Sequence, residues 1–519
     1  MNHNINVFML FAPKFSQFGV DVAKELLKKY GGGKIFGICV GPLNLVKSIE
    51  NSLGDQCGKL WHLHTEEQKW LTKDWSMKDL SKKLSRIDNE LGVGTLGRFI
   101  VADRRVGKGF VRGGLCRPDT IAQKIETAPQ LQPQKYIAGL YNFIESVLDE
   151  TQPNLIFCYA VAGAPALALA EISQAKGIVF ARLNTTRIGQ SNVIDDSPTG
   201  QLDCVARTYK SLVNNQLNLE QERVKAKKIL EDFRSHPEPP EYTKRNQELL
   251  KAQNPLKITL KALLGTPYHL AKCWVKKQSY LEARQAISRN FFGARVMWKK
   301  ALLNQATFTS DLPTKDRPFI YFPLHVDPEA STMVLSPWHT DQISVIESLA
   351  KSAPAEMIIV VKEHAPMLGK RPRGFYEKIA TMPRVILIGP EHNGLSIVQK
   401  AELTAVITGT AAWEAIRLGK PTLIIGNSPF LAIGEGMIHE PCLANLPSSI
   451  SKALTIPSAS DEALELYLTA CLAESFEMSS SLLWGKYEQH SEQERQKAVN
   501  NIVNGIEKRI TEFNEKSFY

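Results

Sequence analysis

Short apolar, β-branched runs alternate with helical patterns over the first 200 residues. Residues 5–11 and 34–40 have the near-continuous apolar character of buried strands, and VDVAKELLKKYGGG between them has a helical period that ends in glycines. Residues 152–182 form the clearest unit, in which NLIFCY predicts a strand, ALALAEISQAKG a helix and IVFAR the next strand. Strand, helix and strand at this spacing predict a crossover between parallel strands.

A second alternating series begins at residue 318. FIYFPL, MIIVVK, RVILIG, TAVITG and TLIIGN are five apolar runs within residues 318–427, and helical patterns such as DQISVIESLAKSAP separate them. Between the two series, residues 203–300 have long charged helical patterns and the proline-rich break HPEPPEY. From residue 460 to the end the pattern is helical throughout.

The fold class that this pattern predicts is α/β, with two Rossmann-like doubly wound domains, a helical basic insertion and C-terminal helices. We expect an N-terminal domain over residues 1–200, the insertion over 201–309, a C-terminal domain over 310–460 and helices over 461–519. Two such domains with a helical tail resemble the GT-B architecture of nucleotide-sugar glycosyltransferases. Ligands of such sheets bind beyond the carboxyl ends of the strands.

The charge of the chain is concentrated in one segment. Overall, 43% of the residues are hydrophobic and 22% charged, which is globular composition and excludes disordered and collagen-like classes. The net charge is +10, and residues 251–300 carry all of it, with eleven basic residues against one acid. Apolar side chains lie among the lysines: Leu260, Leu263, Leu264, Tyr268, Leu270 and Trp274. We expect an anionic membrane or a charged lipid-linked acceptor as the partner of this segment, with a solvated basic helix as the alternative. Nucleic acid is not expected, because no RNA- or DNA-binding motif accompanies the charge.

The cysteines and the N-terminus indicate a cytoplasmic protein. The eight cysteines are scattered without a CxxC pair or Cys/His ligand spacing, which indicates a reducing compartment and no metal site. MNHNINVFMLFAPKF lacks a basic n-region and resembles a buried strand, and no apolar stretch is long enough to span a bilayer. We expect peripheral attachment at the inner face of the cell membrane as the closest association with lipid.

Several common motifs are absent or out of context. Residues 92–97 match G-x-G-x-x-G, but they follow a polar helical segment and precede an apolar run, whereas a dinucleotide fingerprint leaves a strand and opens a helix. GxxxxGK[ST], HExxH and GxSxG do not occur. These observations argue against NAD or FAD binding and against phosphate-loop ATPase, zincin and α/β-hydrolase functions.

Residues 408–414, TGTAAWE, are the strongest local signal. They follow the strand TAVI and open a helix, and small residues at such a turn let main-chain N–H groups approach a phosphate. Thr408 and Thr410 can add hydroxyl donors beside Gly409, and Glu414 on the first helical turn could accept hydrogen bonds from a ribose. A simple N-cap box is the alternative for Thr410 and Glu414.

A second candidate group follows the strand MIIVV. Lys362 and His364 lie in VVKEHAP, at the carboxyl end of that strand. An imidazole there can donate to a phosphate or, if protonated, stabilise a leaving group. The alternative for His364 is a packing or capping residue.

The segment HVDPEAST, residues 325–332, follows the strand FIYFPL. It concentrates His325, an aspartate, Glu329 and Ser331 at another carboxyl end. These residues could bind the donor, and the alternative is a turn in which Glu329 and Ser331 cap the next helix.

The N-terminal half offers one carboxylate and several guanidinium groups. Asp103 ends the run IVAD and is our candidate for a catalytic carboxylate that acts on an acceptor hydroxyl or at the anomeric centre. Arg104 follows it, and Arg182 and Arg187 follow the strand GIVFA, so all three could bind an anionic sugar. A structural salt bridge explains Asp103 equally well.

Residues 318–430 resemble the bacterial capsule-polysaccharide biosynthesis family. The resemblance rests on FIYFPLHVDPEAST, IVVKEHAPMLGKRPRGFYEKIATMPRVILIGP and VITGTAAWEAIRLGKPTLIIGNSPF in that order. It implies a GT-B-type transferase acting on capsule or lipopolysaccharide glycans, and some relatives use a CMP-activated ulosonic sugar. In such relatives a His-Pro motif and a hydroxyl-rich loop contact the nucleotide phosphate. His364 and residues 408–410 take those roles by similarity, although this chain has His-Ala-Pro.

The function expected from the sequence is glycosyl transfer from a nucleotide-sugar donor to a polysaccharide or lipid-linked glycan acceptor. The C-terminal domain would bind the donor and the N-terminal domain the acceptor, without a metal or another cofactor. Two alternatives fit the same architecture: a nucleotide-sugar 2-epimerase, and a non-catalytic glycan-binding assembly or export factor.

Overall fold

The structure is a computed structural model of the 519-residue chain. It describes residues 4–106, 110–114, 132–238, 250, 254–275, 280–303, 307–309, 311–313, 317–483 and 487–517. The chain divides into two compact units. Unit 1 comprises Met1–Val106, Ile121–Ala226 and Leu466–Tyr519, and unit 2 comprises Gly107–Thr120 and Lys227–Glu465.

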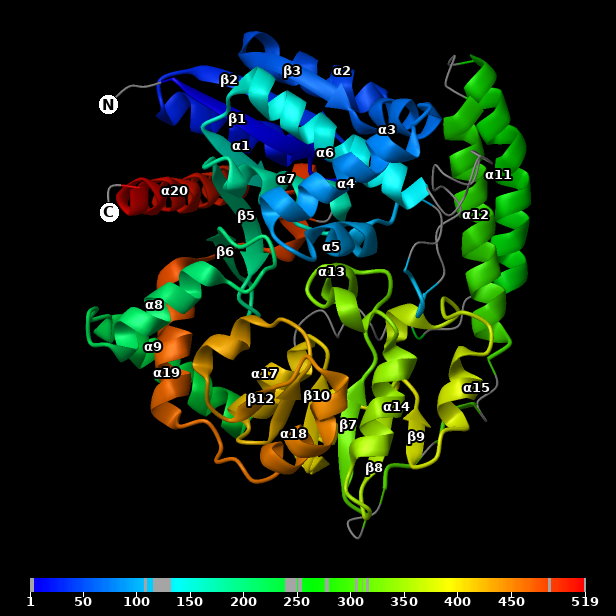
Figure 1. Ribbon diagram of the computed structural model, residues 1–519, viewed down its shortest axis with the longest axis vertical. Coiled ribbons are helices and arrows are strands. Elements are labelled where there is room, and N and C mark those ends of the chain that lie inside the picture. The colour runs from blue at the N-terminus through cyan, green and yellow to red at the C-terminus, as the bar shows by residue number, and fades with distance from the viewer. Residues whose placement is uncertain are drawn as a thin grey trace. The chain divides into compact units, whose positions relative to one another are not determined.

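Unit 1 is built on a seven-stranded sheet in the order β13-β6-β5-β4-β1-β2-β3 (Figure 1). The strands are β1 (Ile5–Phe11), β2 (Gly33–Cys39), β3 (Cys57–His62), β4 (Leu155–Cys158), β5 (Val179–Thr185), β6 (Ser191–Asp195) and β13 (Ser475–Glu477). Strands β3, β2, β1, β4 and β5 are parallel to one another, whereas β6 runs antiparallel to both β5 and β13. The predicted crossover is present, because α7 (Ala164–Ala175) connects β4 to β5.

Helices cover both faces of this sheet. Alternate side chains of β1, such as Val7 and Phe11, enter a core shared with α1, α2 and α20. Phe8 points to the other face, where its ring stacks on Trp61 with 6.1 Å between centroids. The other helices of this unit are α1 (Ser16–Lys29), α2 (Asn44–Leu53), α3 (Leu63–Thr72), α4 (Met77–Leu91), α5 (Thr95–Ala102), α6 (Gln132–Thr151), α8 (Asp203–Val213), α9 (Glu220–Ser235), α19 (Asp461–Glu474) and α20 (Glu492–Ser517). Helices α9 and α19 each continue into unit 2.

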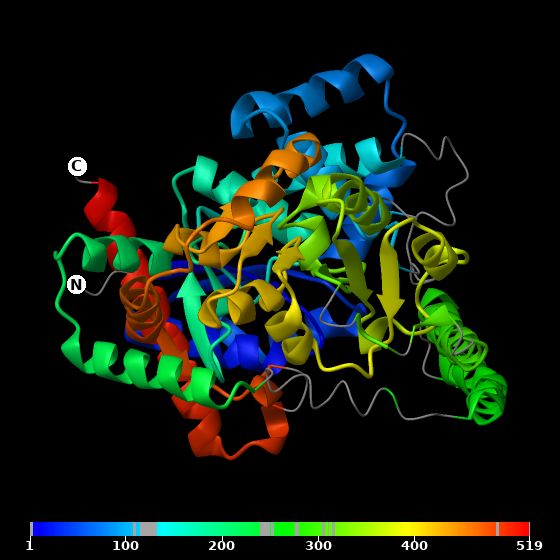
Figure 2. The ribbon, with the colours of Figure 1, turned by 90° about the horizontal axis from the view of Figure 1, so that it is seen from below.

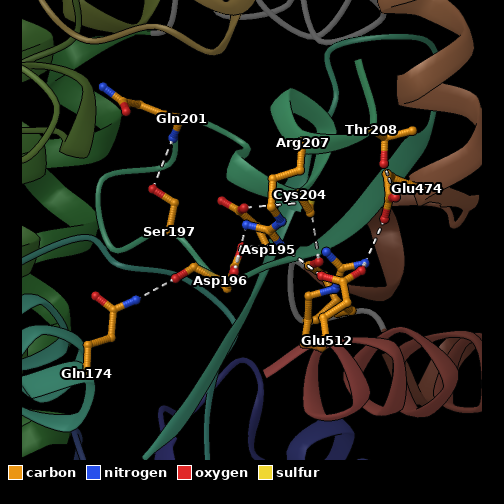
Figure 3. Close-up of polar contacts among 12 residues, drawn as sticks. Gln174, Asp195, Asp196, Ser197, Gln201, Cys204, Arg207, Thr208, Glu474 and Glu512 are labelled. Atoms are coloured by element: carbon orange, nitrogen blue, oxygen red, sulfur yellow. Dashed lines mark hydrogen bonds and ion pairs between the residues drawn. The ribbon is translucent and has the colours of Figure 1, made fainter. Parts of the chain in front are cut away.

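The C-terminal helix α20 is tied to unit 1 by ion pairs (Figure 3). Arg207 in α8 contacts Asp196 and, on α20, Glu512, each with 2.9 Å between nitrogen and oxygen. Arg509 of α20 pairs with Glu474 of α19 at 2.7 Å, and both side chains are buried. A buried pair of this kind is costly to break, so it holds the end of the chain on the sheet.

Unit 2 has a six-stranded, wholly parallel sheet in the order β12-β11-β10-β7-β8-β9. Its strands are coloured from light green to orange in Figure 2. The strands are β7 (Phe319–Pro323), β8 (Ile358–Lys362), β9 (Val385–Ile388), β10 (Leu403–Val406), β11 (Thr422–Ile424) and β12 (Met437–His439). The helices are α11 (Pro255–Val275), α12 (Tyr280–Ala301), α13 (Ala330–Met333), α14 (Gln342–Ser352), α15 (Phe375–Ala380), α16 (Gly394–Lys400), α17 (Thr410–Arg417) and α18 (Leu446–Ala453). Helices α14, α15 and α18 share one core with alternate strand residues, whereas α16 and α17 pack on the strands outside that core.

The predicted fold class is confirmed, because both units are doubly wound α/β structures with largely parallel sheets. One detail is wrong: the tail is not helical throughout, since residues 475–477 form β13 and pair with β6. Ser475–Glu477 is short and lies at the sheet edge, where little apolar side chain is required. Within the described residues, no helix combines the length and apolar character needed to cross a membrane.

Candidate functional site

The carboxyl ends of β7 and β10 meet at the middle of the sheet of unit 2. The chain proceeds outward from β7 to β9 in one direction and from β10 to β12 in the other. Strands β7 and β10 are parallel neighbours. Loops that leave two neighbouring strands in opposite directions form the topological switch point at which such sheets bind ligands. The loops 324–332 and 407–410 therefore lie where a ligand is expected.

His325 connects these two loops. Its main-chain N–H donates to the side chain of Gln342 at 2.7 Å, and the Gln342 amide donates back to its carbonyl at 3.3 Å. Its ring Nε2 accepts the main-chain N–H of Thr408 at 3.2 Å. Both His325 and Gln342 are buried. This clamp fixes the start of loop 408–410 against the end of β7.

The contact with Thr408 also defines the protonation of His325. A ring nitrogen that accepts a main-chain N–H carries no proton, so in the neutral ring the proton is on Nδ1. Burial, together with the nearby His364 and Arg371, lowers the pKa of His325 to about 3. His325 is therefore neutral near pH 7 and holds the loop as a hydrogen-bond acceptor.

Arg371 joins the loops that follow β7 and β8. It donates to both carboxylate oxygens of Glu363, at 2.7 and 2.8 Å, and to the carbonyl of His325 at 3.0 Å. Its remaining terminal nitrogen donates to the carbonyl of Gly113 at 2.8 Å. Glu363 and Arg371 are almost completely buried. The pair is bidentate, and each guanidinium nitrogen of Arg371 donates a hydrogen bond. Such a network fixes the positions of the loops that it joins.

A short segment from the first part of the chain, residues 110–114, belongs to unit 2 at this point. The main-chain N–H of Gly113 donates to Asp327 at 2.6 Å. A Cβ at Gly114 would lie 1.8 Å from the carbonyl oxygen of Asp327. Only glycine allows such a close approach of two main chains. Segment 110–114 thus completes the surroundings of the loop after β7.

The helix α17 begins at the switch point without a side-chain cap. Gly409 is its N-cap, with φ −74° and ψ 157°, and a glycine has no side chain with which to cap the first turn. Two other helices of this sheet are capped, α14 by Asp341 and α16 by Asn393. The first N–H groups of a helix have no intrahelical acceptor and carry part of the positive end of the helix dipole. The start of α17 therefore has the chemistry of an anion-binding site.

The loop after β7 supports the entry to α17. The Thr408 hydroxyl donates to the carbonyl of Ser331 at 3.1 Å, and the Ser331 hydroxyl donates to Glu329 at 3.0 Å. Glu329 occupies the N-cap position of α13, but its side chain makes no capping hydrogen bond. The structure thus brings Glu329 and Ser331 together with Thr408, as expected for residues of one site.

Glu414 lies on the buried side of α17. Because the helix begins at Thr410, Glu414 is in the second turn and not in the first as predicted, so a capping box does not explain it. Burial raises the pKa of Glu414 to about 7, although Arg417 and Lys362 oppose the shift. Burial also lowers the pKa of Lys362, which Glu363, Glu391 and Glu414 counteract. The charges of Lys362 and Glu414 therefore influence each other's pKa.

His364 follows Lys362 at the end of β8. Its main-chain N–H donates to the carboxylate of Glu363 at 2.5 Å. Burial and the positive charge of Lys362 lower the pKa of His364 to about 4. The ring is therefore neutral near pH 7, where it can donate a hydrogen bond to a phosphate but carries no positive charge.

Asp103 lies in unit 1, at the end of α5. Its two carboxylate oxygens accept the main-chain N–H groups of Arg105, at 2.7 Å, and Val106, at 3.1 Å. Burial raises its pKa to about 6. Next to it, the half-buried Arg105 pairs with the buried carboxylate of Glu67. These contacts close a loop, and the catalytic role of Asp103 stays a prediction.

The three arginines of unit 1 lie in different surroundings. Arg104 is half-buried near Gly163, the N-cap of α7. Arg182 is buried in β5 opposite Asp195 of β6 and donates to the carbonyl of Pro198 at 3.3 Å. Arg187 is exposed in the turn between these strands.

Sequence reasoning missed three residues that organise the loops of unit 2: Gly113, Gln342 and Arg371. The glycine pair in VRGGL was the signal for the close approach at 113–114. Nothing local indicates the partners of Arg371, since Gly113 is 258 positions away in the chain. In the described residues there is no cluster of three or more His, Cys, Asp or Glu that could hold a metal ion.

Comparison with known proteins gives matches to solved structures. No family model matches the chain, and no curated protein matches its sequence. The Kdo 2,7 transferase KpsC of Thermosulfurimonas dismutans is 15% identical, with a TM-score of 0.36 over 70% of this chain and 89% of that one. The UDP-GlcNAc 2-epimerase of Neisseria meningitidis, bound to UDP-GlcNAc, is 11% identical, with a TM-score of 0.22 over 90% and 98%. The calicheamicin glycosyltransferase CalG4 is 10% identical, with a TM-score of 0.26 over 97% and 98%. The assignment of the fold rests on the strand order itself.

Proposed function

We propose that this chain is a glycosyltransferase that binds the phosphate of a nucleotide-activated sugar at the start of α17. The observation that carries the proposal is the uncapped N-terminus of α17 at the switch point of unit 2. His325 orients its entry, and the positive charge of Lys362 acts on Glu414 of the same helix. Such an arrangement stabilises negative charge on a leaving phosphate.

The neighbouring residues have complementary roles in this proposal. The N–H groups after Gly409 and the hydroxyl of Thr410 bind the phosphate, and neutral His364 donates a further hydrogen bond. Glu414 accepts from the ribose. The donor is a nucleotide sugar, with a CMP-linked ulosonic sugar as the leading candidate, and the acceptor is a capsule or lipopolysaccharide glycan precursor. In unit 1, Arg104, Arg182 and Arg187 are the candidates for binding an anionic sugar, and Asp103 is the candidate catalytic carboxylate.

A carboxylate placed at the N-cap of α17 tests this binding site. Gly409→Asp caps the helix with a favoured residue and puts negative charge where the phosphate would bind. The new Cβ would lie 3.4 Å from the His325 ring, so the side chain fits with a small shift. We expect the variant to keep its melting temperature and to lose at least about ten-fold in affinity for CMP and UDP by calorimetry.

Asn393→Asp is the matched control, because it makes a similar charge change at the cap of α16 in the same sheet. It should bind nucleotides as the unmodified protein does. If Gly409→Asp still binds nucleotides normally, the phosphate does not bind at the start of α17. If the unmodified protein binds no nucleotide at all, the proposed function is wrong.

Turnover distinguishes the transferase from the two alternatives. Nucleotide release that requires a glycan acceptor supports glycosyl transfer. An isomerised donor formed without acceptor identifies an epimerase, and binding without any turnover identifies an assembly or export factor.

A further inference from the structure

The helix α11 has the reverse of the usual polarity of a surface helix. Its outward positions carry eight large apolar side chains that are 46% to 86% exposed: Leu256, Leu260, Leu263, Leu264, Tyr268, Leu270, Trp274 and Val275. On a helix with 3.6 residues per turn these positions fall within about half of the circumference, so they form one continuous face of the helix. We call this set the outer face of α11. Contiguous apolar exposure of this extent marks a binding surface.

The inner side of α11 packs on α12 through small and polar residues. The indole N–H of Trp298 donates to the Thr259 hydroxyl at 2.9 Å, and the Asn290 amide donates to His269 at 3.2 Å. Ala262 is buried between these contacts. Helices pair through small residues and hydrogen bonds when their apolar side chains face a lipid environment instead of each other.

Lysines border the outer face, and no acid accompanies them. Lys257 and Lys261 are one helical turn apart, and Lys272 follows three turns later along the same side of α11. The 21 residues of α11 include no aspartate or glutamate. Apolar residues bordered by lysines are typical of a helix that lies in the plane of a membrane interface. A second copy of this chain is a poorer partner, because it would bring like charges together.

The hairpin of α11 and α12 is anchored to the rest of unit 2. Lys299 near the end of α12 donates to the carbonyl of Arg371. A Cβ at Gly369 would lie 2.3 Å from the carbonyl oxygen of Val296, so the loop 369–371 is in close contact with α12. Because Arg371 also organises the loops of the candidate site, the hairpin is linked to that site through one residue.

We propose that the outer face of α11 binds an anionic lipid surface. The helix lies in the interface, with its leucines and Trp274 among the acyl chains and its lysines at the phosphates of the headgroups. This inference does not depend on the proposed glycosyl transfer, because it rests on the surface of α11 alone.

Vesicle co-sedimentation of the full chain tests the electrostatic part. The probes are phosphatidylcholine vesicles with and without phosphatidylglycerol. Each lysine near an anionic surface is worth about a five-fold change in affinity, so reversing three should weaken binding about a hundred-fold. The charge-reversed protein carries Lys257→Glu, Lys261→Glu and Lys272→Glu. The control protein carries Lys378→Glu, Lys400→Glu and Lys452→Glu, which reverse three exposed lysines elsewhere in unit 2. It should bind vesicles almost as well as the unmodified protein.

The apolar contribution to binding is tested by measuring whether Trp274 inserts among the acyl chains. Trp274 is 86% exposed, so phosphatidylglycerol vesicles with brominated acyl chains should quench part of the protein fluorescence. Trp274→Phe should remove that quenching while binding persists. The variant Leu260→Ser/Leu264→Ser should lose binding, whereas Leu217→Ser, an exposed leucine outside the hairpin, should not. Circular dichroism verifies that each variant is folded.

Three results would overturn the proposal. The first is equal affinity for neutral and anionic vesicles, and the second is full binding by the charge-reversed protein. The third is a dimer in sedimentation equilibrium that Leu260→Ser/Leu264→Ser dissociates while vesicles bind no protein, which would assign the outer face to a second copy.

Discussion

At the scale of single residues, burial controls the charges at the edge of the sheet in unit 2. It keeps His325 and His364 neutral near pH 7 and brings Glu414 to the midpoint of its titration at that pH. The guanidinium of Arg417 lies 3.4 Å from the ring centroid of Phe233, and burial lowers its pKa to about 10. The imidazole rings in the loops around α17 therefore carry no charge near pH 7.

Glu414→Gln should change how stability depends on pH. The folded pKa of Glu414 is about 7, above its ordinary value of 4.5, so the folded protein holds a proton that the unfolded chain releases between these values. The carboxyl therefore lowers the free energy of unfolding as pH rises from about 4.5 to 7, by up to about 3 kcal/mol. We expect Glu414→Gln to gain stability relative to the unmodified protein over this range in urea unfolding.

Glu402→Gln, which alters an exposed carboxyl of the same unit, serves as the control and should follow the unmodified protein. Parallel pH profiles for the unmodified protein and Glu414→Gln would contradict the raised pKa.

At the scale of elements, a short segment completes unit 2. Residues 110–114 contribute two main-chain hydrogen bonds, one from Gly113 to Asp327 and one from Arg371 to Gly113. They also bring Gly114 against the main chain of Asp327. The segment is thus part of the surroundings of loop 324–332, although residues 1–106 belong to unit 1.

Gly114→Ala should displace this segment. The added methyl group would overlap the Asp327 carbonyl, and moving the main chain should cost about 1–3 kcal/mol. We expect faster hydrogen exchange in peptides that contain residues 110–114 and 325–327, together with weaker nucleotide binding. Gly293→Ala in α12 is the control, because a Cβ there meets nothing within 4 Å. Unchanged hydrogen exchange in Gly114→Ala would show that the close approach of Gly114 to Asp327 is not needed to hold segment 110–114 in place.

At the scale of the whole molecule, each unit has its own core and its own buried ion pair. Arg371 and Glu363 are enclosed in unit 2, whereas Arg509 and Glu474 hold α20 in unit 1. Removing one partner of a buried pair leaves an uncompensated charge and costs about 3–5 kcal/mol. Damage in one unit should therefore be distinguishable from damage in the other.

Calorimetric unfolding can separate the two units. We expect Arg371→Met and Arg509→Met to lower different unfolding transitions. Lys351→Met, which breaks the exposed pair with Glu347, should destabilise the protein by at most about 1 kcal/mol and shift neither transition appreciably. If both buried-pair variants lowered one and the same transition, the units would not unfold separately.

Local patterning was enough to predict the central strands and the βαβ unit. Residues 5–11, 155–158 and 319–323 are apolar because both faces of a covered parallel sheet are buried, so their strands are visible in the sequence. Residues 408–410 could also be placed at a strand's carboxyl end, because small residues directly follow an apolar run. Three edge strands were missed: β3, β12 and β13 are short or partly polar, and edge positions need less apolar surface.

The sequence by itself thus determined which segments are strands and helices and which loops carry polar residues, since both depend on residues a few positions apart. The tertiary structure decided which of those loops meet. The order of the strands makes β7 and β10 neighbours and brings His325 to Thr408, 83 positions later in the chain. It likewise brings Arg371 to Gly113 and Glu363. Contacts of that range depend on how whole elements pack and on the entropy of closing long loops, and no local pattern of residues records them.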